Sequence, residues 1–292
     1  MERFDKDIRP PVIFKSALEK EVMVPAYKRA LKILERESLS PEMFSDTYNQ
    51  DMLNRHAAYV EDRKQIFADQ RATNESWARA ELFGKTLEGI LHHQINEGVY
   101  GEDVRGVSTT PYDDYHAGID EVIERYGEDG STYIGCAIDM TFGNPSKKIQ
   151  RINDDIVQGR MHDVIYYESP FGTPPHIHGK LQGIPKVVVG MDVSNLIKLS
   201  SEWNNMDQEA LNKNHLFLNI LRQMQMQSEV YSDVAKKSGQ EEVQERYNKV
   251  HSAVSRLYQE QREAKDIDFL DTSVTEDLVN KAIRTELGKL ET

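Results

Sequence analysis

The segment that most constrains the fold is residues 117–143, which read AGIDEVIERYGEDGSTYIGCAIDMTFG. Two runs of strand-forming residues are separated by a polar turn that contains glycine, and each run carries an aspartate, Asp120 or Asp139. A carboxylate among apolar strand residues raises the free energy of the fold unless a partner compensates its charge. The segment therefore predicts a β-hairpin whose two aspartates have a partner in common or a role in binding.

Helical patterns lie on both sides of this hairpin. Residues 75–97 carry an apolar stripe that ends at Leu91 and Ile95, as an amphipathic helix does. The predicted core, residues 75–200, lies between an N-terminal helical region (1–74) and a C-terminal helical hairpin with a tail (201–292). Its expected elements are a helix at 75–97, strands at 115–125 and 132–142, a helix at 145–158, a strand at 162–169, a loop at 171–183 and a strand at 186–192.

The overall charge limits what the chain can bind. The 292 residues include 36 Lys and Arg against 49 Asp and Glu, which gives a formal net charge of -13. A protein that coats nucleic acid over a broad surface is normally basic, so this class is disfavoured, whereas a local basic groove is compatible with the composition. A carboxylate-rich site for a divalent metal would add to the negative count.

The same composition bears on location. No apolar run approaches the roughly 20 residues that span a bilayer, and the N-terminus has no signal-like apolar stretch. The single cysteine, Cys136, lies in an apolar run, where it is expected to act as a small buried hydrophobic residue. We therefore expect a cytoplasmic protein without a membrane partner.

The chemistry of paired acids on rigid strands is well suited to phosphate esters. Hydrolysis of a phosphodiester needs positive charge near phosphorus and the leaving oxygen, and Mg²⁺ held by carboxylates supplies it. Residues alternate between the two faces of a strand, so Asp139 shares its face with Gly135 and Ala137. Those small residues leave room beside the acid. The hairpin thus predicts a metal platform, to which a nearby lysine would add a group that orients water.

The order of these motifs resembles that of the PD-(D/E)xK nuclease superfamily over residues 80–200. GIDEVIE is similar to its first motif strand, AIDMT to its second, and GKTLEGIL to the helix that precedes them. The resemblance implies a restriction-endonuclease-like mixed sheet with flanking helices and a metal-dependent nuclease, with DNA favoured over RNA as substrate. It further implies that Mg²⁺ or Mn²⁺ is bound by Glu88, Asp120, Asp139 and the main-chain carbonyl of Met140.

One position departs from the family pattern. The family has a lysine two residues after the second acid, and this chain has Thr141 there. A threonine hydroxyl can position water but carries no positive charge. Since some branches take this lysine from a neighbouring element, Lys148 is the first candidate replacement and Lys147 the second.

Other interpretations of the same residues remain open. Asp120 and Asp139 could be exposed at strand ends or paired with basic residues, and Glu88 could belong to a solvated helix face with Lys85. The chain would then be a structural or interaction protein with a degenerate nuclease-like core, whose C-terminal helices bind a protein partner.

Several further patterns favour ordinary structural roles. The spacing of His176 and His178 would suit Zn²⁺ only if two more ligands converged, so a polar loop is expected there. His92 and His93 are expected to be solvated, and the glutamines of residues 217–231 are expected to face solvent or a partner. The apolar seam from Val243 to Leu257 is expected to pack within the chain.

Overall fold

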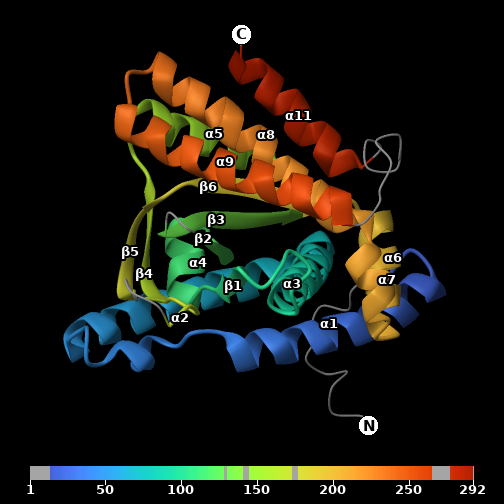
Figure 1. Ribbon diagram of the computed structural model, residues 1–292. Helices are drawn as coiled ribbons and strands as arrows, with labels where there is room; N and C mark the ends of the chain where they lie inside the picture. Colours follow the sequence, from blue (N-terminus) through green and yellow to red (C-terminus); the bar gives the residue numbers. More distant parts are fainter. Residues whose placement is uncertain (1–13, 128–129, 141–144, 173–176, 265–276, 292) are drawn as a thin grey trace.

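The chain folds into a mixed α/β structure in which helices surround two small sheets (Figure 1). The first sheet has four strands and the second has two. This computed structural model describes residues 14–127, 130–140, 145–172, 177–264 and 277–291, without the side chains of residues 71–73 and 136–140.

The larger sheet has the strand order β1-β2-β3-β6. The first three strands are antiparallel neighbours, and β6 runs parallel to β3. In this register Glu121 lies opposite Cys136, and Gly135 lies beside Lys186. The strands are β1 (Val104–Ser108), β2 (Glu121–Gly127), β3 (Gly130–Met140) and β6 (Lys186–Met191), with β4 (His162–Glu168) and β5 (His178–Ile184) forming the second sheet.

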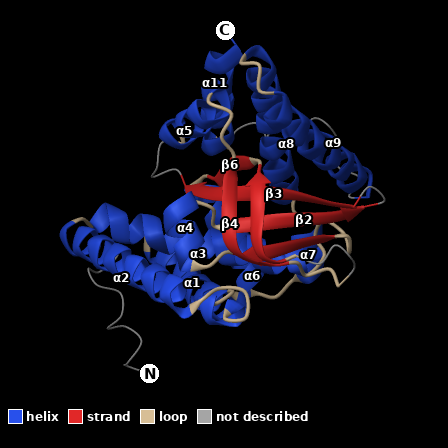
Figure 2. Ribbon diagram, turned by 90° about the vertical axis from the view of Figure 1, so that its left-hand side faces the viewer, coloured by secondary structure: helices blue, strands red, loops and turns tan. Residues whose placement is uncertain are grey.

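Helices lie on both sides of the larger sheet, and the β4–β5 sheet packs on part of one face. Figures 1 and 2 show α5, α8, α9 and α11 gathered on one side of the molecule and α1, α2 and α3 on the other. The helices are α1 (Ala17–Glu37), a 3₁₀ turn at Pro41–Phe44, α2 (Gln50–Thr73), α3 (Glu75–Asn96), α4 (Pro111–Ala117), α5 (Ser146–Val157), α6 (Val193–Asn204), α7 (Gln208–Lys213), α8 (His215–Lys237), α9 (Glu241–Ala264) and α11 (Leu278–Glu291).

Alternate residues of each strand point to opposite faces of the larger sheet, and the side chains on the two faces pack in different hydrophobic clusters. Ile123, Val187 and Val189 belong to the largest cluster, which also contains apolar side chains of α1, α3, α6, α8 and α9. Val122 packs instead against the β4–β5 sheet, and Val188 packs against α5 and the C-terminal helices. Burial on both faces explains why the KVVVGM run has no polar alternation.

Helices α1 and α3 approach each other closely because both carry small residues at the contact. A Cβ built on Gly89 would lie 2.5 Å from the Cβ of Ala30 and 2.7 Å from its Cα. Ala30 and Ala26 are fully buried at this interface. Gly84, one turn earlier on α3, has nothing within 4 Å of such a Cβ.

We expect Gly89→Ala and Gly84→Ala to change stability in opposite directions. The first overpacks a backbone contact, for which a loss of about 1–3 kcal/mol is typical. The second replaces a poor helix former in open space and should stabilise the protein by up to about 1 kcal/mol. Urea unfolding of both variants measures the difference, and equal shifts would contradict a close α1–α3 contact.

Side-chain amides close both edges of the larger sheet. On the β1 edge, Asn96 donates to the Gly106 carbonyl and accepts from the Gly106 N–H. On the β6 edge, Gln227 pairs in the same way with Val188, and Gln223 pairs with Gly190. Each amide takes the place of a neighbouring strand, so the edges present no unpaired template at these positions.

Three expectations about local structure were wrong. Residues 111–117 form helix α4 and the strand begins only at Glu121, because Thr110 caps the helix and Pro111 opens it. The expected loop at 171–183 contains the first residues of β5. The glutamines Gln223 and Gln227 of α8 are fully buried rather than solvated. The seam from Val243 to Leu257 packs within the chain as predicted, chiefly against α8 and the sheet.

Candidate functional site

Three acids and a lysine meet where α3 and α4 approach the start of β2. The ammonium of Lys85 lies 2.7 Å from a carboxylate oxygen of Glu88, one turn along α3, and 3.9 Å from that of Asp114 on α4. The carboxyl groups of Asp114 and Asp120 lie close together, because Asp120 acts on the pKa of Asp114 both through its charge and through a side-chain contact. We call Glu88, Asp114 and Asp120 the acidic cluster.

The local sequence explains how α4 delivers its acid to this cluster. Thr110 caps the first turn, and Gly118 ends the helix in the left-handed conformation, at φ 62°. That reversal sends the chain directly into β2, and the Asp120 carbonyl accepts a hydrogen bond from Thr109 N–H at 3.2 Å. Asp114 and Asp120 are therefore brought together by a short helix and one tight turn.

Burial and the neighbouring charges perturb the pKa values of Glu88, Asp114 and Lys85. Burial raises the pKa of Glu88 to about 8, with Lys85 opposing the shift and Asp120 reinforcing it. Burial and then the charge of Asp120 raise the pKa of Asp114 to about 7. For Lys85, burial acts to lower the pKa, but the three neighbouring carboxylates outweigh it and the net pKa is raised.

Lys186 is a buried lysine beside the acidic cluster that the sequence analysis did not single out. It begins β6, is only 6 % exposed, and its ammonium donates to the Ala117 carbonyl at 2.6 Å. Burial lowers its pKa to about 8, although the charge of Asp120 acts to raise it. The hydroxyl of Tyr247 on α9 accepts from the Lys186 N–H and donates to its carbonyl, which fixes the backbone of this residue.

The space that Lys186 occupies depends on Gly118. A Cβ at Gly118 would lie 3.2 Å from the Lys186 ammonium, and its positive φ disfavours other residues. The glycine of the GID sequence thus turns the chain and leaves room for the amine.

The structure describes the side chains of some predicted metal ligands and only the backbone of others. Glu88 and Asp120 belong to the acidic cluster. The backbone of Asp139 lies beside Gly190 and that of Met140 beside Met191, whereas their side chains, and the whole of Thr141, lie outside the described residues. Glu121 pairs with Cys136 across the β2–β3 hairpin. Asp120 directly precedes Glu121, and Asp139 comes three residues after Cys136, so both aspartates are at the same end of this pairing.

The two candidate lysines of α5 differ in their surroundings. Lys148 is half-buried, and its charge acts to lower the pKa of Asp114 and of Lys186. Lys147 is exposed on the same first turn. The assignment of a catalytic lysine to either residue stays a prediction.

A second buried charge cluster lies on the other face of β2. His92 contacts the Glu121 carboxylate at 2.9 Å through Nδ1 and that of Glu37 at 3.0 Å through Nε2. Burial acts to lower the pKa of His92, but both carboxylates outweigh it and raise the pKa to about 9. The expectation of a solvated His92 was therefore wrong. This cluster connects α1, α3 and β2, and we give it a structural role.

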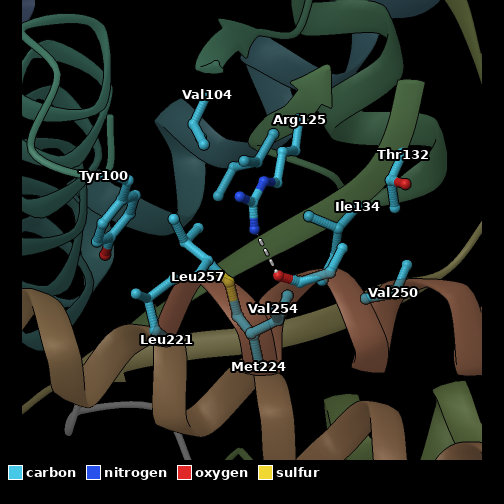
Figure 3. A pocket seen from close by; sticks show the side chains of 12 residues that line it. Tyr100, Val104, Arg125, Thr132, Ile134, Leu221, Met224, Val250, Val254 and Leu257 are labelled. Atoms are coloured by element: carbon cyan, nitrogen blue, oxygen red, sulfur yellow. Dashed lines mark hydrogen bonds between the residues drawn. The ribbon is translucent and has the colours of Figure 1, made fainter. Parts of the chain in front are cut away.

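The remaining candidates lie away from the acidic cluster. His178 contacts Glu168 and Asp46 and stacks on Phe44, whereas His176 lies outside the described residues. An apolar cavity of about 20 Å³ lies between the sheet and the α8–α9 hairpin, with Arg125 donating to the Ala253 carbonyl at its rim (Figure 3). This volume is about that of one water molecule, so the cavity is too small for a substrate.

The described residues contain neither a preformed metal-binding group nor a membrane-spanning helix. They contain no group of three or more His, Cys, Asp or Glu side chains arranged to hold a metal ion. Among the helices in the same part of the chain, none has the length and apolar character that a membrane crossing requires.

In comparisons with known proteins, no family model, curated protein or solved structure matches this chain.

Proposed function

We propose that this protein is a metal-dependent nuclease whose active site is the acidic cluster together with Asp139 and Lys186. The observation that carries the proposal is the convergence of Glu88, Asp114 and Asp120, where burial and then the charge of Asp120 act to raise the pKa of Glu88 and of Asp114. The order of elements supports it, because α3, the β2–β3 hairpin, α5 and the later strand β6 come in the order that the nuclease resemblance implies, with β1 and α4 before the hairpin and β4 and β5 before β6.

The donor set suits Mg²⁺ or Mn²⁺. These are oxygen-seeking ions, and Mg²⁺ commonly binds proteins through one or two carboxylates while keeping several waters. Asp120 and Asp139 would be the principal ligands, with Glu88, Asp114 and the Met140 carbonyl in supporting positions. The bound ion would stabilise the negative charge that develops on the phosphoryl group during hydrolysis.

The protein's own residues then have separate roles. Lys85 holds Glu88 in place through their 2.7 Å contact. Lys186 lies within reach of the charge of Asp120, and its amine would orient the attacking water by hydrogen bonding. A lysine whose pKa is about 8 can also exchange a proton with that water near neutral pH.

A cleavage assay on labelled DNA and RNA with Mg²⁺ or Mn²⁺ tests the proposal. We expect metal-dependent cleavage by the wild type and a loss of about 10²–10⁴-fold in Glu88→Gln, Asp120→Asn and Asp139→Ala. Glu61→Gln, on the exposed surface of α2, serves as the control and should retain full activity. Absence of cleavage with either metal, or equal activity in all variants, would contradict the enzymatic proposal.

The alternative proposal is a non-catalytic interaction protein with a degenerate nuclease-like core. Thr141 at the position of the family lysine is the observation that favours it. On this alternative, the C-terminal α8–α9 hairpin would bind a protein partner. Calorimetric binding of Mn²⁺ without cleavage of either nucleic acid would support it.

A further inference from the structure

Helix α5 presents two basic residues next to the acidic cluster. Lys148 and Arg151 are separated by three positions and therefore lie on one side of the helix. The neighbouring face, with Ile149, Ile152 and Ile156, is buried against the C-terminal helices and Val188 of β6, and Lys148 borders it. This packing fixes the orientation of α5 relative to the strand that begins with Lys186, as Figure 1 shows.

The charges of these residues reach the acidic cluster and its lysine. Lys148 acts on the pKa of both Asp114 and Lys186, and Arg151 acts on that of Lys186. Arg151 is exposed. The chain as a whole is acidic, with a net charge of -13, so two basic residues beside the acidic cluster form a locally positive surface.

We infer that Lys148 and Arg151 bind backbone phosphates of a nucleic acid whose cleaved bond lies at the acidic cluster. The inference rests on the proposed nuclease function and assigns its substrate-binding surface. An arginine guanidinium offers paired donors that match phosphate oxygens, and a lysine adds a point charge. Phosphates adjacent to the cleaved bond would thus meet cations on α5, while the cleaved phosphate meets the metal ligands.

A second basic hollow competes for this assignment. Lys249, Arg256 and Arg125 line a space of about 220 Å³ near the turn between β2 and β3. That turn is at the far end of β2 from Asp120, roughly 20 Å away for a strand of this length. Arg125 there is already paired with Asp103 and Glu260. A phosphate bound in the hollow would be too distant to place its neighbour at the acidic cluster.

Salt dependence of DNA binding distinguishes the two surfaces. Binding of a labelled 20-base-pair DNA duplex to the full chain is followed by fluorescence anisotropy in EDTA, across a range of salt concentrations. Each lost phosphate contact lowers the slope of log K against log salt by about 0.9. We therefore expect Lys148→Ala/Arg151→Ala to lower the slope by about 2 and the charge-matched Lys249→Ala/Arg256→Ala to leave it unchanged.

Two controls separate this inference from the proposed function. In Lys148→Ala/Arg151→Ala thermal melting should be unchanged, and Mn²⁺ should bind at least as tightly as to the wild type because two nearby positive charges are removed, which shows that fold and metal site persist. Three outcomes would overturn the inference: an unchanged slope in that variant, a larger change in the Lys249/Arg256 pair, or no DNA binding by the wild type. None of them decides whether the acidic cluster binds Mn²⁺, which the titration tests separately. A reduced slope without cleavage under any metal would support the surface and contradict the nuclease.

Discussion

Lys186→Met is expected to slow cleavage by about 10²–10⁴-fold, the usual contribution of a positioned acid–base group, without lowering the free energy of unfolding. The Lys186 ammonium is buried, and the contact recorded for it is a neutral carbonyl rather than a carboxylate. A buried charge in that position opposes folding, so an apolar side chain of similar length should leave stability equal or increase it. Activity and stability would therefore move independently or in opposite directions.

The measurement pairs single-turnover cleavage with urea unfolding for three variants. Lys186→Arg keeps a charge but cannot give up its proton near neutral pH, so it should recover substrate binding and not the rate. Lys180→Met removes an exposed lysine of β5 that is paired with Asp163, and it should leave the rate unchanged. A Lys186→Met protein that is destabilised yet cleaves at the wild-type rate would assign the residue to folding alone.

The order of elements was predictable because its signals are local. Ile149, Ile152 and Ile156 have helical spacing, and the KVVVGM run has the uniform apolar character of a buried strand. Both elements have close to the predicted bounds. The C-terminal hairpin was predicted for the same reason, since the spacing of its apolar seam is visible within a single helix.

The acidic cluster was predictable only in part. Glu88 and Asp120 followed from their motifs, but Asp114 was missed because it lies directly before the predicted strand at 115–125 and no helix was predicted there. The signal against a strand was present in Thr110-Pro111, which caps and opens α4. Lys186 could also have been noticed in the sequence, because it begins a strand that is buried on both faces. Burying its charge there costs free energy, as burying the aspartates of the hairpin does. The contact of His92 with Glu37 and Glu121 joins residues 55 and 29 positions apart, which helical periodicity cannot predict.

The edge of β6 shows most clearly how tertiary context overrides a helix-surface pattern. The Gln227 side chain donates to the Val188 carbonyl at 2.6 Å and accepts from its N–H at 2.9 Å. Sequence reasoning treats a glutamine on a helix as solvated, because only the position of the sheet reveals the two backbone groups that need it. In α8 the glutamines at 223 and 227 thus replace a neighbouring strand for β6.

We expect Gln227→Leu to lower the free energy of unfolding by about 2–6 kcal/mol, since it leaves two buried backbone groups unpaired at about 1–3 kcal/mol each. Gln225→Leu is the matched control: that side chain is half-buried and bonds Ser255 Oγ, so its loss should be about 1 kcal/mol. Urea unfolding measures both, and equal losses would contradict the pairing. Because domains are typically stable by only about 5–15 kcal/mol, Gln227→Leu should also populate forms with an open β6 edge, detectable as concentration-dependent aggregation that Gln225→Leu lacks.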